Sequence, residues 1–123
     1  MAADTLIFER TFRIHPRYSK TFSLKVPADK VLVLKVSGAS PDDYSVVLFD
    51  EKGFTYFQKN GDSSWSMHTL EGDSTFTCYL NRKGTLNFVV WNNSYEEKWI
   101  SPTVRVYLRD GKDSTNCFLE YGE

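Results

Sequence analysis

The sequence predicts an all-β fold, an antiparallel two-sheet β-sandwich of jelly-roll-like layout with about eight or nine strands. Three observations favour this class. Apolar and polar residues alternate with a period of two along several segments, which places them on opposite faces of a strand. Turn-forming residues recur about every ten positions, as between the short strands of a sandwich, and almost no segment has helical periodicity. Aromatic residues, which strands favour, make up 15% of the chain.

Length and composition describe one globular domain. The chain has 123 residues, 41% hydrophobic and 25% charged, enough to bury a core of its own. Lys and Arg number 15 and Asp and Glu 16, a formal net charge of −1, which argues against a nucleic-acid binder because such proteins carry a basic excess. No stretch approaches the ~20 apolar residues of a membrane-spanning helix, so only indirect membrane association is expected. The N-terminus MAADTLIFER lacks signal-peptide features, which predicts a cytoplasmic location.

The first three strands are expected at Thr5–Ile14, Ser19–Val26 and Val31–Ser37. The first carries one basic residue, Arg10, on its inward face, and it ends before Pro16, which cannot donate a hydrogen bond to a sheet. The second alternates cleanly between apolar and polar residues. The third is almost continuously apolar, which predicts a strand covered on both faces.

The middle of the chain is expected to add short strands separated by tight turns. The apolar run Tyr44–Asp50 predicts a strand, and Asp50–Gly53 predicts a tight hairpin turn into a further strand, Phe54–Gln58. Trp65–Leu70 is a candidate short strand. A well-marked strand follows, whose inward residues are Phe76, Cys78 and Leu80.

Two apolar segments, Thr85–Asn92 and Ser101–Arg109, are expected to pair as the core hairpin of the domain. An irregular polar-aromatic segment, Asn93–Ile100, joins them, and we call it the bridge. The single sandwich domain then occupies residues 1–109. Residues 110–123 form a short C-terminal extension, in which Asn116–Leu119 can add an edge strand.

The C-terminal half of the chain contains a hydrophobic strand that ends in a turn of aromatic, Asn, Ser and Tyr residues. A strand of the pattern Ser-x-Thr-Val-x-Val follows. The residues of this pattern are Phe88, Trp91, Asn92, Asn93, Ser94, Tyr95, Ser101, Thr103, Val104 and Val106. This pattern resembles the GOLD (Golgi dynamics) domain, and together with Val31–Gly53 the resemblance covers roughly Phe22 to Arg109. It implies a GOLD-like sandwich that acts as a non-enzymatic adaptor or cargo-recognition module in membrane trafficking. Cargo receptors of that family continue into a coiled coil and a transmembrane helix, a continuation not seen here, which favours a free-standing form.

Nothing in the sequence predicts an enzyme, a cofactor or a metal. The one candidate nucleophile pair is Cys78 with His68, but Cys78 is expected on the inward face, where burial disfavours the thiolate and leaves a thiol inert. The histidines, His15 and His68, are expected at the surface, and a bond between Cys78 and Cys117 is left open. No zinc spacing is present. We interpret four acids as solvated turn residues rather than Ca²⁺ ligands: Asp42, Asp43, Asp50 and Glu51.

Surface aromatic residues are the remaining functional signal. Trp, Tyr and Arg tend to anchor protein interfaces, so a protein partner is expected. The alternative of equal weight is that a neighbouring segment covers these rings, and stacking on a sugar is a third. The glycosylation sequon at Asn92 is interpreted as a structural turn. The predicted binding residues are Asn93, Tyr95, Glu96, Glu97, Lys98 and Trp99 of the bridge, with Trp65 and Tyr56.

A carbohydrate-binding or pre-peptidase C-terminal-like accessory sandwich is the alternative function. The stretch Phe22–Gly38 resembles the opening of pre-peptidase C-terminal domains. Those domains normally follow a signal peptide and a catalytic domain, and neither is seen in this sequence. A carbohydrate ligand therefore stays as the second expectation, behind a protein partner.

Overall fold

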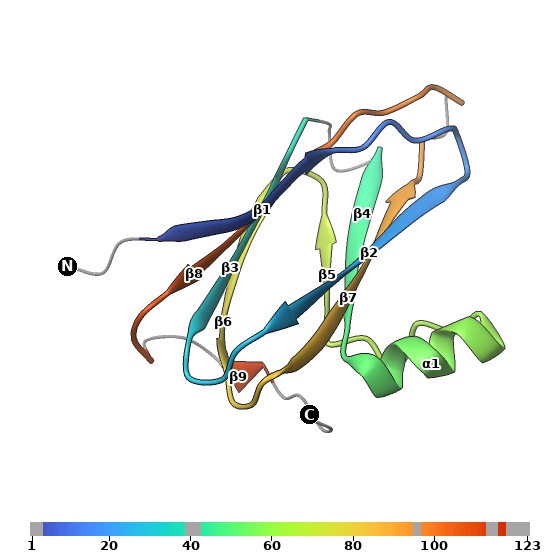
Figure 1. Ribbon diagram of the computed structural model, residues 1–123. Coiled ribbons are helices and arrows are strands. Elements are labelled where there is room, and N and C mark those ends of the chain that lie inside the picture. Colours follow the sequence, from blue (N-terminus) through green and yellow to red (C-terminus); the bar gives the residue numbers. More distant parts are fainter. Residues whose placement is uncertain (1–3, 39–42, 95–96, 113–115, 118–123) are drawn as a thin grey trace.

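The computed structural model describes residues 4–38, 43–94, 97–112 and 116–117, and in them the chain forms two β-sheets and one helix (Figure 1). The sheets face each other as the two layers of a sandwich, which confirms the predicted all-β class. The first sheet has the strand order β1 (Thr5–Thr11), β8 (Thr103–Arg109), β3 (Val31–Ser37), β6 (Ser74–Leu80) and β9 (Asn116–Cys117). The second has the order β2 (Ser19–Val26), β7 (Gly84–Asn92), β4 (Tyr44–Phe49) and β5 (His68–Glu71).

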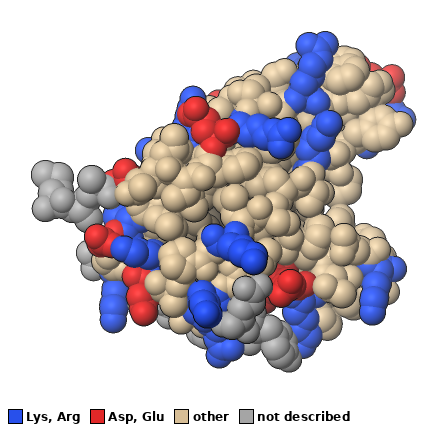
Figure 2. All heavy atoms as spheres, viewed as in Figure 1, with Lys and Arg blue, Asp and Glu red and all other residues tan. Residues whose placement is uncertain are grey.

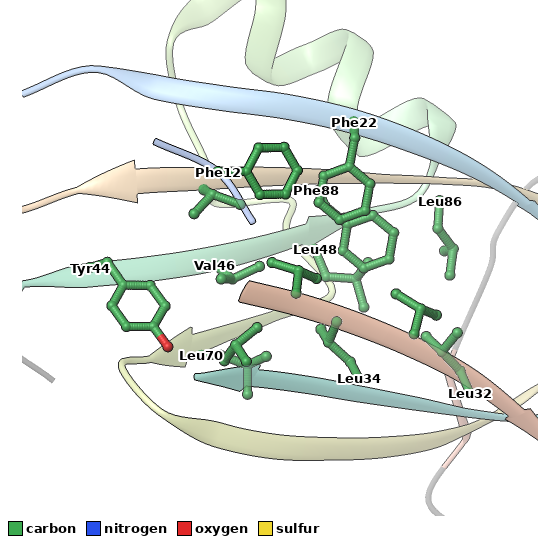
Figure 3. Packing of buried hydrophobic residues seen from close by; sticks show 14 of the residues in the cluster. Phe12, Phe22, Leu32, Leu34, Tyr44, Val46, Leu48, Leu70, Leu86 and Phe88 are labelled. Atoms are coloured by element: carbon green, nitrogen blue, oxygen red, sulfur yellow. The ribbon is translucent and has the colours of Figure 1, made fainter. Parts of the chain in front are cut away.

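The hydrophobic core fills the space between the two sheets (Figure 3). Three phenylalanine rings stack across it, with ring centroids 4.4 Å apart for Phe8 and Phe22 and 4.5 Å apart for Phe22 and Phe88. Phe8 comes from β1 and Phe22 from β2, so this stack joins the edge strands of the two layers. Aromatic stacking of this kind adds about 0.5–1.5 kcal/mol per pair to the stabilisation from buried area.

Most strands lie where alternation predicts them. β2 and β3 have the predicted bounds, and residues Val31 to Leu34 are all buried, as expected for a strand covered on both faces. Leu34 pairs with Val106 on one side and with Phe76 on the other, so β3 is a central strand. In the described part of the chain, all strand pairings are antiparallel except that of β6 with β9.

The predicted core hairpin of Thr85–Asn92 with Ser101–Arg109 is wrong. β7 pairs with β2 and β4 in one sheet, whereas β8 pairs with β1 and β3 in the other. The bridge therefore crosses from one layer to the other. A hairpin loop has about 2–5 residues, and the connection between β7 and β8 is longer, which was the signal that the two strands do not pair.

The predicted hairpin turn at Asp50–Gly53 and the strand Phe54–Gln58 are also wrong, because this segment is the helix α1 (Glu51–Asn60). The side chain of Asp50 accepts a hydrogen bond from the backbone N–H of Gly53 at 2.7 Å, which caps the helix at its N-terminus. Gly61 ends the helix in a left-handed conformation, with a φ of 65°.

The helix forms because its apolar face has a place to pack. Phe54 and Phe57 are three positions apart, so they lie on one face of the helix. They pack on Val47, Phe49 and Val89, on the outer side of the four-stranded sheet. The short apolar segment Phe54–Gln58 fits a strand as well as a helix by its sequence alone. The packing of Phe54 and Phe57 on the sheet decides for the helix. Tyr56, expected on a strand, accordingly lies on α1.

The sulfur of Cys78 is disulfide-bonded and its residue is only 1% exposed. The expectation of a core position is confirmed, and the disulfide, which the sequence left open, is present. The chain holds one other cysteine, Cys117. Its backbone pairs with Leu80 in the parallel contact of β9 with β6, so an edge strand in the C-terminal extension is confirmed at Asn116–Cys117. Positions 118–119 lie outside the described residues.

Candidate functional site

Two connections meet at one end of the sandwich: the link from β1 to β2, and the bridge from β7 to β8. Ile14 and Ile100 form an isolated antiparallel bridge, with backbone N–H donors 2.9 Å and 3.2 Å from the opposite carbonyl oxygens. The N–H of Asn92 donates to the carbonyl of Tyr18 at 3.0 Å. We call the surface formed here the loop end and define it by Arg13, His15, Pro16, Arg17, Tyr18, Glu97 and Trp99.

The Asn92 side chain holds the two connections together from inside. Its amide group donates to the carbonyl oxygens of Ile14, at 3.0 Å, and Lys98, at 2.9 Å, and its oxygen accepts from the N–H of Ser94 at 2.9 Å. Asn92 is 3% exposed, so the carbonyl groups it satisfies lie beside the core rather than in water. This confirms that the Asn92 sequon is a structural turn.

Two further residues of the bridge attach it to the start of β4. The side-chain amide of Asn93 donates to the hydroxyl of Ser45 at 3.0 Å, and its backbone N–H donates to the carbonyl of Asp43 at 2.7 Å. The Lys98 ammonium lies 3.3 Å from the Asp43 carboxylate. Asn93 and Lys98, both predicted as binding residues, therefore hold the bridge in place.

Above this frame, four side chains form a row at the surface. The Arg13 guanidinium lies over the Trp99 ring, 4.8 Å from its centroid. Trp99 meets His15 edge to face with centroids 4.7 Å apart, and His15 meets Tyr18 in the same manner at 5.0 Å. Trp99 remains 49% exposed and Tyr18 63% exposed. The expected exposure of His15 is confirmed.

An ion pair closes the loop end. Arg17 and Glu97 approach to 2.6 Å, from the β1–β2 link and the bridge respectively. Both residues have a left-handed backbone conformation, with φ values of 68° and 53°. Residues other than glycine adopt this conformation rarely, and often at functional sites. Beside the pair lies an open cavity of about 570 Å³, lined by His15, Pro16, Arg17, Tyr18, Glu97 and Trp99.

Trp65 and Tyr56 do not belong to the loop end. Their rings stack at 4.1 Å, with the Lys52 ammonium 5.5 Å from the Trp65 centroid, and both lie at α1. Figure 1 shows α1 at the opposite end of the four-stranded sheet from the Asn92 end of β7. A Cβ atom at Gly53 would lie 2.5 Å from the Trp65 carbonyl oxygen, so this glycine permits the close packing of the Trp65 loop on the helix.

Of the eight predicted binding residues, the structure brings Glu97 and Trp99 together on one exposed surface, while Asn93 and Lys98 attach the bridge to the start of β4. Tyr95 and Glu96 lie outside the described residues. Sequence reasoning missed the contribution of the β1–β2 link. The signal was present, because Arg13, His15 and Arg17 alternate with the buried Phe12 and Ile14, which places all three on the solvent side.

The residues considered for chemistry do not form a catalytic or metal site in the described part of the chain. His68 stacks on Phe76 with centroids 3.9 Å apart, and Cys78 is in a disulfide, so a Cys78–His68 nucleophile pair does not form. Asp50 caps α1 and Asp43 pairs with Lys98. No three His, Cys, Asp or Glu side chains among the described residues are grouped to hold a metal. In the same residues no helix has the length and apolarity to cross a membrane.

Shifted pKa values occur away from the loop end. Burial, and then the hydrogen bond that its hydroxyl donates to Asp73 at 3.0 Å, raise the pKa of Tyr44. The hydrogen bond from Tyr79 to Asp29 raises the pKa of Tyr79, and a hydrogen bond from Arg109 lowers the pKa of Asp4. Figure 2 shows Lys and Arg interspersed with Asp and Glu over the visible face, without one continuous basic field.

No family model matches the chain, and no curated protein matches it. The resemblance to the GOLD domain therefore stays a prediction. Among solved structures, the chain is similar to PliG of Aeromonas hydrophila, a periplasmic lysozyme inhibitor of g-type lysozyme. The two share 13% sequence identity with a TM-score of 0.64, over 87% of this chain and 85% of the other. This likeness shows that the two chains have the same fold.

Proposed function

We propose that this protein is a non-enzymatic protein-binding module and that the loop end is its binding surface. The observation that carries the proposal is that Trp99 and Tyr18 are exposed while the backbone beneath them is fixed by hydrogen bonds and by the buried Asn92. The fold shared with PliG, a protein whose printed function is to inhibit another protein, supports the same conclusion.

The energetics favour a protein ligand at such a surface. Large aromatic side chains and arginine supply most of the binding free energy of protein interfaces. Binding is weakened by the entropy lost when interface side chains become ordered. At the loop end, Arg13 and His15 already hold the Trp99 ring in contact before any partner arrives. The entropy lost on binding is correspondingly small.

The test begins with co-purification of the native protein to identify a partner, followed by calorimetric titration of that partner into purified variants. Trp99→Ala and Tyr18→Ala are each expected to weaken binding by about tenfold or more while Tm stays nearly unchanged. The matched control is Trp65→Ala, which removes an equally exposed tryptophan at the other end of the sheet. Equal losses in all three variants, or no loss at Trp99, would refute the loop end as the binding surface.

A second candidate is inhibition of a carbohydrate-cleaving enzyme. The likeness to PliG favours it, as does the disulfide at Cys78, because disulfides persist in oxidising compartments such as the periplasm. A titration of the purified chain against a g-type lysozyme, read as the rate of cell-wall lysis, tests this directly. Stoichiometric loss of lysis supports the candidate, and full lysis at a large molar excess of the chain excludes it for that enzyme.

The finer expectations from the sequence rest on less. The GOLD-type adaptor role in membrane trafficking is supported only by the residue patterns at Val31–Gly53 and Phe88–Val106. The cytoplasmic location stays a prediction, and the disulfide favours an oxidising compartment instead. The structure offers little support for carbohydrate binding, since Arg13 lies over the Trp99 ring and Tyr56 stacks on Trp65, leaving less free ring surface for a sugar. A glycan array tests carbohydrate binding directly: saturable binding of a sugar supports it, and absence of binding supports a protein partner.

A further inference from the structure

The loop end carries one positive charge that its own residues do not balance. It contains two guanidinium groups, Arg13 and Arg17, and one described carboxylate, Glu97, which is paired with Arg17 at 2.6 Å. Among the ion pairs formed by the described part of the chain, none includes Arg13. Lys98 nearby is already paired with Asp43. Among the described residues of the loop end, Arg13 is therefore the cation that is available to a ligand.

Arg13 is also held in a geometry suited to an anion. Its guanidinium lies 4.8 Å above the centroid of Trp99, and this ring is braced by His15. A guanidinium stacked on an aromatic ring keeps the N–H donors along its edges free, and their fork matches the two oxygens of a carboxylate. The Trp99 ring at the same time screens the guanidinium from part of the solvent, which strengthens a charge-assisted hydrogen bond made there.

The neighbouring surface distinguishes a protein carboxylate from a small anion. The open cavity next to Trp99 has a volume of about 570 Å³. It is lined by the polar side chains of His15, Arg17 and Glu97 and by the apolar surfaces of Pro16, Tyr18 and Trp99. The Glu97 carboxylate is paired with Arg17. A free phosphate or acetate would leave these apolar surfaces in water. An acidic side chain with apolar neighbours on a protein surface would cover them and reach Arg13 together.

We propose that Arg13, stacked on Trp99, receives an Asp or Glu carboxylate of an acidic protein partner whose neighbouring apolar side chains cover the exposed Tyr18 and Trp99 rings. This inference rests on the protein-binding function proposed above. It names the chemistry of the partner's contact, which that function leaves open.

A phage-displayed library of short random peptides, selected on the immobilised full chain, tests the inference. The expected result is a set of peptides enriched in Asp or Glu next to aromatic or aliphatic residues. Synthetic copies of these peptides should bind at least about tenfold more weakly to Arg13→Glu, and less tightly to the wild type as the salt concentration rises. Arg13→Lys, which keeps the charge but loses the planar fork, should give an intermediate affinity.

Arg10→Glu is the matched control. The Arg10 guanidinium also lies over a ring, 5.4 Å from the centroid of Phe12, but Phe12 is buried and Arg10 is outside the loop end. The same reversal of charge at Arg10 should leave the peptides bound. Equal losses for Arg10→Glu and Arg13→Glu would show general electrostatic attraction and overturn the inference.

Other outcomes separate this inference from the proposed function. A selection that yields no peptide, or peptides without acidic enrichment, overturns the carboxylate contact. If such non-acidic peptides are lost in Trp99→Ala, the loop end is still a binding surface and only the inference fails. If acidic peptides bind Trp99→Ala and Tyr18→Ala as tightly as the wild type, the loop end itself is excluded.

Discussion

The side-chain amide of Asn92 donates to the carbonyl oxygen of Ile14 at 3.0 Å, although the two residues are separated by 78 positions in the sequence. Asn92 lies at the last position of β7, and Ile14 lies in the link that leaves β1. The contact joins the two connections that form the loop end, together with the bond from the same amide to Lys98.

We expect Asn92→Ala to lower the free energy of unfolding by about 1–3 kcal/mol, because the side-chain hydrogen bonds to Ile14 and Lys98 are lost beside the core. Asn92→Asp should also be destabilising, because a carboxylate accepts from Ser94 but cannot donate to Ile14 or Lys98. Urea unfolding followed by tryptophan fluorescence measures the change. Asn93→Ala is the control, since Asn93 is exposed and its side chain bonds to one hydroxyl. A smaller loss at Asn92 than at Asn93 would contradict this account.

Gly53→Ala should destabilise the protein although alanine is the better helix former by about 1 kcal/mol. The added Cβ would lie 2.5 Å from the carbonyl oxygen of Trp65, a backbone atom, so the Trp65 loop must move away from α1. Thermal unfolding of the variant should show a lower Tm. Gln58→Ala, an exposed substitution in the same helix, should leave Tm unchanged or slightly higher. A stabilised Gly53→Ala would show that the loop is not packed as described.

Loss of the disulfide should lower stability by about 2–4 kcal/mol, because the unfolded chain gains freedom when the covalent link is removed. The double variant Cys78→Ala and Cys117→Ala removes it, and dithiothreitol reduces it in the wild type. Tm measured with and without dithiothreitol should fall in the wild type and stay constant in the variant. A wild-type Tm that does not respond to full reduction, verified by thiol titration, would contradict the expectation.

Stability should decline in strongly alkaline solution, in part through Tyr44. Burial, and then the hydrogen bond to Asp73, raise the pKa of Tyr44 in the folded protein above the ordinary value of 10.0. A raised pKa means that the folded state keeps its proton while the unfolded state loses it. The stabilisation that protonated Tyr44 gives the folded state is therefore fully present below pH ~10 and is lost as the pH rises above that value.

Tyr44→Phe should reduce this alkaline loss, at the expense of one hydrogen bond, or about 0.5–1.5 kcal/mol, at neutral pH. Urea midpoints measured from pH 8 to pH 11, a range set by the tyrosine pKa of about 10, provide the comparison. Tyr107→Phe is the control, because Tyr107 lies in β8 of the other sheet and its replacement leaves the Tyr44 environment intact. Identical pH profiles for wild type and Tyr44→Phe would show that Tyr44 does not contribute to the loss of stability in alkaline solution.

Local patterns in the sequence predict strands but not their partners. The alternation that places Phe22 and Val26 inward depends only on neighbouring residues, so β2 was predicted with its correct bounds. Pairing depends on contacts between distant segments, and β7 and β8 show the same apolar pattern whether they form a hairpin or belong to two sheets. The helix α1 was missed for the same reason, since Phe54 and Phe57 find their apolar partners on another element.

The candidate site was predicted in part. Trp99 and Glu97 were identified from the polar-aromatic composition of the bridge, which is a local property. The five residues that complete the surface come from the β1–β2 link, and long-range contacts such as those of Asn92 and Ile100 bring that link to the bridge. The separation of Trp65 from Trp99 likewise follows from the position of α1, which no local pattern revealed.

The crossing of the bridge from the four-stranded to the five-stranded sheet makes the loop end a seam between the two layers of the sandwich. A partner bound to the aromatic rings of the loop end would contact segments from both layers at once. The two sheets could then separate only after the partner dissociates. Binding at the loop end would therefore stabilise the packing of one sheet on the other, and not the local structure of one sheet alone.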